Sequence, residues 1–198
     1  VRQLEDDIIF PVCEMERNAA PLDAALLEAW VKESEQEYIR CLYSVSRDLG
    51  FNVEPKTKDW VRVFEKLKLT IEHRTDKGAP SFTDDVLKHV NHPIVQQLRR
   101  ASKLASLRSK FLVPYHKALT EDHKLRYALH QLRVDNYGTV RGRFSSSNKN
   151  IQQVPAVEKQ KVIFGDNYVV RQLFKPESGV FLAADAKQIE YRIFAHYA

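Results

Sequence analysis

The chain has 198 residues, 43% of them hydrophobic, with few prolines and glycines, so it is long enough for a hydrophobic core and unlike collagen or a wholly disordered protein. No run of about 20 apolar residues occurs, which argues against a membrane-spanning helix, and the N-terminus lacks the apolar core of a signal peptide. The formal net charge of +5 is uneven: residues 1–91 carry −5, residues 92–149 carry +9 and residues 150–198 carry +1. This central basic segment predicts attraction for a polyanion such as nucleic acid, although a solvated surface has the same composition.

The two cysteines and the first residue bear on where the chain works. Cys13 and Cys41 have no Cys or His neighbours at metal-ligand spacing, so we expect free thiols in a reducing, cytoplasmic environment. The chain begins with Val1 rather than Met, which suggests a processed or excised segment.

The patterns over the first ninety residues are mainly helical. Residues 8–11 are expected to form a strand or loop. A long amphipathic helix should then begin after Asp23, a good N-cap, and end at Leu49 before Gly50. A second helix is predicted over 58–69, followed by a turn-rich loop over 75–80 and a short helix from Thr83.

Another long helix is predicted after Pro93, and Pro114 should end or kink it. One of its faces carries polar side chains at helical spacing: Arg99, Lys103, Ser106 and Lys110. The two long helices can pack as an antiparallel pair.

The pattern changes after residue 124, where short apolar pieces replace helical periodicity. Residues 180–184 form a continuous apolar run that predicts a buried strand, and residues 189–197 return to helical spacing. The predicted fold class is therefore α+β, helical in front and mixed behind.

Asp185 directly follows the predicted buried strand. A carboxylate in that position needs a positive partner, such as Mg²⁺ with its preference for oxygen ligands, or else it caps the helix that follows. Glu190 is either a second acidic group of the same site or an ordinary surface residue. The residues alone leave these alternatives open.

A second polar segment covers residues 138–155. It contains arginine, serine, asparagine and glutamine side chains, which suit phosphate, sugar and base-edge contacts, although a polar surface loop has a similar composition.

Together the two segments resemble, in the same order, two signature blocks of family A (polymerase I-type) DNA polymerases. The first block is matched by Gly142-Arg143-Phe144-Ser145-Ser146 and by residues 150–155. The second, motif A, is matched by residues 185–192. The resemblance implies a palm-proximal segment over 1–22, a helical thumb over 23–124 and a partial palm with an incomplete antiparallel sheet over 125–198.

The resemblance implies part of a template-directed polymerase that extends a primer 3′ end with deoxynucleoside triphosphates. Asp185 and the carbonyl of Ala186 would bind catalytic Mg²⁺, two ions about 3.5–4 Å apart in the complete site. Gln188 and Ile189 would lie beside the incoming nucleotide. Glu190 matches the steric gate against ribonucleotides, which disfavours the alternative of a single-subunit RNA polymerase relative.

The resemblance also implies contacts with primer-template DNA. Arg143 would reach the minor groove at the primer terminus, Asn150 and Gln152 would contact the template-primer, and Arg99 with Lys103 would hold the duplex backbone.

The sequence departs from the family pattern in three places. Ala186-Lys187 replaces Tyr-Ser, and Lys187 either binds phosphate or lies in solvent. The spacing between His130 and Gly142 exceeds the common bacterial form, and residues 134–138 resemble phage versions.

No second catalytic aspartate or fingers helix precedes Ala198. We therefore expect the chain to be inactive alone and to need a second polypeptide or C-terminal segment, which would cover exposed apolar palm surface. The alternative is a non-catalytic duplex DNA-binding fragment.

Overall fold

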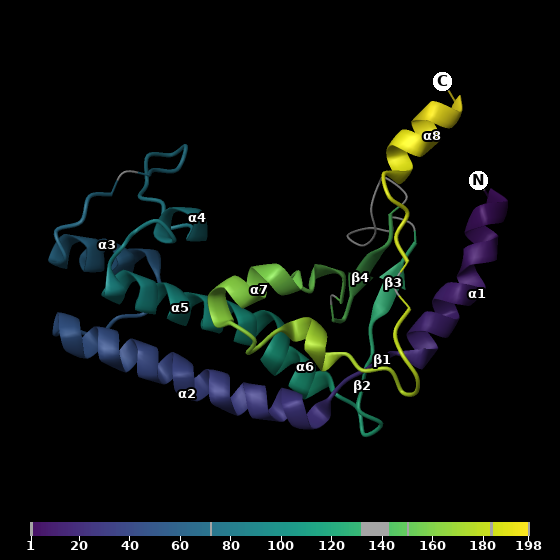
Figure 1. Cartoon of the computed structure of the whole chain (residues 1–198), viewed down its shortest axis with the longest axis horizontal. Coiled ribbons are helices and arrows are strands. Elements are labelled where there is room, and N and C mark those ends of the chain that lie inside the picture. The colour runs from purple at the N-terminus through teal and green to yellow at the C-terminus, as the bar shows by residue number, and fades with distance from the viewer. Residues whose placement is uncertain (1, 72, 132–142, 150, 183, 198) are drawn as a thin grey trace.

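The computed structural model describes residues 2–71, 73–131, 143–149, 151–182 and 184–197. Helices dominate these ranges (Figure 1): α1 (Arg2–Asn18), α2 (Ala24–Leu49), α3 (Thr57–Lys66), α4 (Asp84–Leu87), α5 (Pro93–Leu107), α6 (Val113–Ala118), α7 (Val157–Phe164) and α8 (Ile189–Tyr197). Three further helical turns are η1 (Arg108–Leu112), η2 (Ile151–Gln153) and η3 (Val170–Leu173). The strands are β1 (Ala20–Pro21), β2 (Lys124–Leu125), β3 (Ala128–His130) and β4 (Ser145–Ser147).

Helix α2 has the ends that its sequence predicts. The Asp23 carboxylate accepts a hydrogen bond from the Leu26 amide at 3.1 Å. At the other end Gly50 adopts a left-handed conformation with φ 78°, and its amide donates to the Ser46 carbonyl. Helix α3 matches its prediction within three residues at its C-terminus.

The helix after Pro93 does not end before Pro114, because the π-helical turn η1 precedes the proline and allows the helix to continue into α6. The Val113 amide donates to the Arg108 carbonyl, five residues earlier, and α6 then continues to Ala118. Proline lacks an amide hydrogen and its ring conflicts with the carbonyl four residues earlier, so a locally wider turn relieves both problems.

The two long helical segments pack as an antiparallel pair, as predicted (Figure 1). Together with the short antiparallel strand pairs β1–β2 and β3–β4, the helices confirm the α+β class. One buried cluster lies where α2 meets η1 and α6, and it includes side chains from far downstream: Leu27, Trp30, Leu112, Tyr115, Phe164, Tyr168 and Leu173. A second cluster lies where α3 and α4 pack on the far ends of α2 and α5, and it includes Val45, Trp60, Phe64 and Leu98.

Two short antiparallel ribbons complete the described fold. In the first, Ala20 pairs with Leu125 and Pro21 with Lys124, so the two ends of the helical segment are joined at its base. In the second, β3 pairs with β4 in the register Ala128 to Ser147. The domain boundaries at 22/23 and 124/125 stay a prediction.

Arg100 fixes α7 against the helix pair. Its guanidinium donates to the Glu37 carboxylate of α2 at 2.5 Å and to the Ile163 carbonyl of α7 at 2.6 Å. Tyr168 donates its hydroxyl to the same carboxylate at 3.0 Å. Within the loop after α7, the buried Gln160 side chain bonds the Tyr168 carbonyl and the Val170 amide. The backbone of α7 is therefore held from several directions.

Two predictions for local structure are wrong. Residues 8–11 lie inside α1, which contains Pro11, because good helix formers such as Glu14, Met15 and Arg17 follow it and no strand partner is found within the described ranges. The strand expected over 180–184 is also absent from its described residues: Val180, Phe181 and Leu182 are 88%, 61% and 95% exposed. An isolated strand leaves its backbone groups without partners.

The cysteines and the helices are each expected to have a particular character: free thiols, and no membrane-spanning helix. Cys13 is exposed, Cys41 is buried, and both are free thiols. Among the described residues, no helix is both long enough and apolar enough to cross a membrane.

Candidate nucleic-acid interface and active-site segment

The basic pair on α5 is held by one acidic residue. Arg99 Nε lies 2.6 Å from one oxygen of Asp84, and Lys103 Nζ lies 3.0 Å from the other. Arg99 also donates to Gln96 at 3.2 Å. Asp84 begins α4, so a short helix that the sequence places at a distance brings a carboxylate onto the predicted DNA-binding face.

This contact affects the ionisation of Asp84. Partial burial raises the pKa of its carboxyl, but hydrogen bonds and charge from Arg99 and Lys103 outweigh burial and hold the pKa below its usual range. The group therefore carries two cations and one anion, and part of the basic charge is neutralised within the protein.

Part of the polar segment over 138–155 forms a two-stranded ribbon; its residues 138–142 lie outside the described ranges. Ser145–Ser147 pair with β3, and the His130 ring nitrogen lies 2.6 Å from the Ser147 hydroxyl oxygen. Gln152, in η2, donates to the Phe144 carbonyl at 3.2 Å. Asn150 lies outside the described residues, so its predicted DNA contact stays a prediction.

An ion pair joins the two signature segments. Arg143 Nη2 lies 2.6 Å from Glu190 Oε1, although 47 residues separate them in sequence. Both side chains are exposed, at 72% and 77%, so water screens the pair and its contribution to stability is small. The pair matters because it shows that the two segments lie side by side: the predicted primer-contacting Arg143 meets Glu190, the predicted steric gate.

The predicted catalytic segment is exposed to solvent. Asp185, Ala186 and Gln188 are exposed and precede α8, and Ile189 begins that helix with 52% exposure. Gln188 has a left-handed backbone with φ 53°, and its carbonyl accepts a hydrogen bond from the Arg192 amide. Asp185 therefore does not follow a buried strand, contrary to the prediction.

The donor set at Asp185 is compatible with a divalent cation but incomplete. A carboxylate and the neighbouring Ala186 carbonyl supply hard oxygen atoms of the kind that Mg²⁺ prefers. Among the described residues, no group of three or more His, Cys, Asp or Glu side chains could hold a metal ion. Further ligands would have to come from elsewhere.

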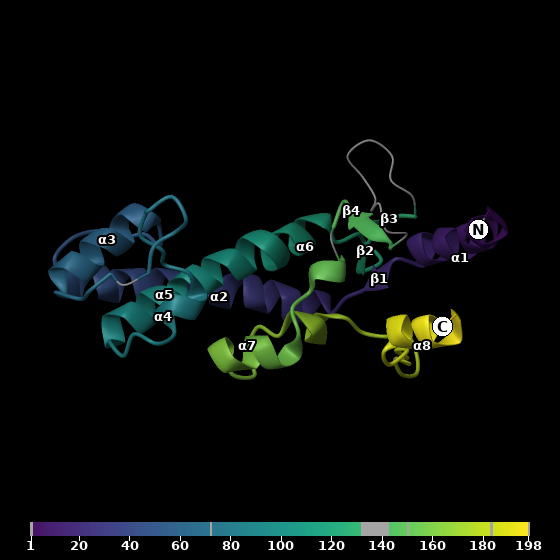
Figure 2. The same ribbon diagram turned by 90° about the horizontal axis from the view of Figure 1, so that it is seen from above.

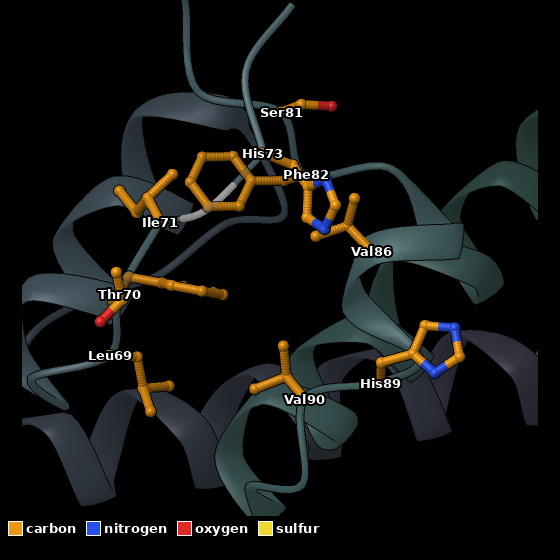
Figure 3. Close-up of a pocket in the computed structure, with 10 residues that line it drawn as sticks. Leu69, Thr70, Ile71, His73, Ser81, Phe82, Val86, His89 and Val90 are labelled. Carbon is orange, nitrogen blue, oxygen red and sulfur yellow. The ribbon is translucent and has the colours of Figure 1, made fainter.

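A separate hollow of about 300 Å³ lies at the far end of the helix pair, where α3 and α4 pack (Figure 3). Figure 3 shows Phe82, Ile71 and Val86 around it, with the His73 and His89 rings on the side of α4. It contains none of the residues predicted for DNA or nucleotide binding.

Comparison with known proteins decides the family. The sequence profile of DNA polymerase family A matches residues 26–198. The chain belongs to this family. The family resemblance drawn from motif A and the preceding block is therefore confirmed.

Relatives come from both bacteria and phages. The chain is 32% identical to the thermostable DNA polymerase I of Thermus filiformis over 98% of this chain and 23% of the relative. It is 27% identical to DNA polymerase DpoZ of Salmonella phage PMBT28 over 94% of this chain and 32% of the relative. The chain thus spans about a quarter to a third of these relatives, and a phage-type source stays a prediction.

A solved structure shows the same fold. It is the POL domain of Pol1 from M. smegmatis, in complex with DNA primer-template and dNTP, with a TM-score of 0.70 and 21% identity. The match covers 93% of this chain and 32% of that one.

Sequence reasoning missed Asp84 as a partner of the basic pair. Nothing local marks it, since Asp84 lies 15 residues before Arg99 and resembles an ordinary helix-start aspartate. The contact exists because α4 packs against α5.

Proposed function

We propose that this chain is the thumb and the opening of the palm of a template-directed DNA polymerase that extends a primer 3′ end with deoxynucleoside triphosphates. The observation that carries the proposal is the Arg143–Glu190 ion pair, which joins the two family segments in space. Membership of DNA polymerase family A and the fold shared with a polymerase domain support it.

Asp185 is the proposed catalytic aspartate. Its carboxylate and the Ala186 carbonyl would hold Mg²⁺, which when bound favours ionisation of the primer hydroxyl and offsets charge on the phosphates. The exposure of Asp185 leaves room for substrate phosphates and for ligands from another segment.

Residues 188–190 are proposed to bind the nucleotide. Gln188 and Ile189 would lie beside the triphosphate, and Glu190 would occupy the space that a ribose 2′-hydroxyl needs. Because the Arg143–Glu190 pair is exposed and weak, Arg143 can leave Glu190 and contact the primer terminus at little cost.

Arg99, Lys103 and Gln152 are proposed to contact the primer-template. The Arg99 and Lys103 cations would bind backbone phosphates. When no DNA is bound, Asp84 would hold both side chains in place. Gln152 would offer its amide to the template-primer.

The rest of the active site is proposed to come from a further polypeptide segment. Leu182 is 95% exposed and Phe194 is 73% exposed, which is costly for large apolar side chains in water. A segment bearing the fingers and the second aspartate would cover them.

Primer extension tests the proposal. The chain is mixed with a polypeptide that carries the remaining palm and fingers, and extension of a labelled primer is followed with Mg²⁺ present. We expect extension that falls at least about a thousandfold in Asp185→Ala, because the remaining ligands cannot bind the metals. Asp76→Ala, an exposed loop substitution, is the control and should extend normally.

Absence of extension in every pairing would refute the enzymatic proposal. If the chain nevertheless binds primer-template duplex, the alternative of a non-catalytic DNA-binding fragment would stand.

A further inference from the structure

Beyond Arg99 and Lys103, whose charge Asp84 partly neutralises, the same surface of α5 continues toward η1. Ser106 and Lys110 lie further along the same helical face and are exposed. They line a hollow of about 220 Å³, together with Lys103 and with Lys159, which comes from α7. No aspartate or glutamate is among the described residues that line it.

Lys110 and Lys159 differ from Arg99 and Lys103 in their charge balance. Neither makes an ion pair with an acidic side chain in the part of the chain that the structure describes. Lys161, two residues further along α7, is instead paired with Asp166 at 2.7 Å. Two uncompensated cations from separate elements therefore face one hollow.

The position of Lys159 is set by packing. Arg100 holds the Ile163 carbonyl, and Gln160, next to Lys159, is buried and hydrogen-bonded to the loop after α7. Phe111 and Phe164 form part of the apolar floor of the hollow. Such a floor leaves the lysine stems in apolar contact while their ammonium groups reach solvent.

The hollow is lined in part by α7, which lies on the same side of the molecule as α8 and the preceding Asp185. In both views α7 and α8 lie on the same side of the α2–α5 pair (Figure 1, Figure 2). A DNA strand that is bound at α5 and α7 can therefore extend toward the segment that contains Asp185.

We propose that Lys110 and Lys159, with the Ser106 hydroxyl, form a two-sided site for the sugar-phosphate backbone of duplex DNA. The inference rests on the proposed function and extends it, because it assigns α7 to the DNA-binding surface and adds a phosphate contact beyond Arg99 and Lys103. Phosphate contacts of this kind carry affinity and orientation but no sequence preference.

Salt-dependent binding tests this site. Binding of a fluorescently labelled primer-template duplex to the full chain is measured by anisotropy over a series of salt concentrations. In the double variant Lys110→Ala/Lys159→Ala, we expect the slope of log affinity against log salt to become shallower by about two units, one for each lost phosphate contact. Unrelated duplex sequences should give the same change.

The matched control removes two positive charges elsewhere. Lys32→Ala/Lys161→Ala deletes two lysines that are already paired, with Glu28 and Asp166, and should leave the slope nearly unchanged. Equal slopes for the two double variants would overturn the inference while leaving DNA binding by the chain intact. Absence of duplex binding by the unaltered chain would overturn both this inference and the DNA-binding part of the proposed function.

Discussion

At the scale of single residues, Asp84 offsets part of the positive charge that Arg99 and Lys103 give to one face of α5. Its pKa is lowered in the folded chain, so its ion pairs stabilise the fold above the ordinary carboxyl pKa, and this stabilisation is lost as pH falls through the lowered value. We expect Asp84→Asn to unfold at lower urea concentration than the unaltered chain at pH 7, with the difference shrinking below about pH 4.

Urea unfolding at several pH values measures this effect, and Asp85→Asn is the neighbouring control. Asp85 is 87% exposed in its pair with Lys88, so its substitution should change stability little at any pH. Identical pH profiles for the two variants would show that the shared contact with Arg99 and Lys103 is not stabilising.

At the scale of elements, Arg100 joins α2, α5 and α7. Its removal leaves Glu37 with the Tyr168 hydroxyl but without its cation, and leaves the Ile163 carbonyl without its donor. We expect Arg100→Ala to lower the free energy of unfolding by about 2 kcal/mol, the usual scale for hydrogen bonds to charged groups. Chemical denaturation measures the loss.

Arg47→Ala is the matched control at this scale. Arg47 forms an exposed pair with its neighbour Asp48, so its loss should cost less than about 0.5 kcal/mol. If both variants lose the same stability, α7 is not held through Arg100, and the rigid placement of Lys159 loses its basis.

At the scale of the whole molecule, the chain has a packed helical body and an uncovered C-terminal region. Helix α8 has no buried residue, whereas α2 and α5 share two buried clusters. We expect amide hydrogens over 184–197 to exchange within seconds in the chain alone, while those in the middle of α2 and α5 exchange orders of magnitude more slowly.

Hydrogen exchange with mass spectrometry distinguishes the two regions. Adding the polypeptide with the remaining palm should slow exchange over α8 and leave α2 unchanged. Protection of α8 equal to that of α2 in the monomeric chain would contradict the proposed incomplete palm.

The sequence by itself determined the features that depend on neighbouring residues. Asp23 and Gly50 are the ends of α2 because capping is a local interaction, and the apolar stripes of α2 and α5 predict their pairing because helical spacing places those side chains on one face. The order of the two signature segments was sufficient to predict the family.

Tertiary structure decided which distant groups meet. Asp84 reaches Arg99 and Lys103, Arg143 reaches Glu190, and Lys159 lines the same hollow as Lys110 only because the fold brings separate elements together. The strand predicted over 180–184 is not formed by its described residues, because a strand also depends on a distant partner. A strand is stable only beside another strand, and its described residues have none, so their apolar side chains remain in solvent.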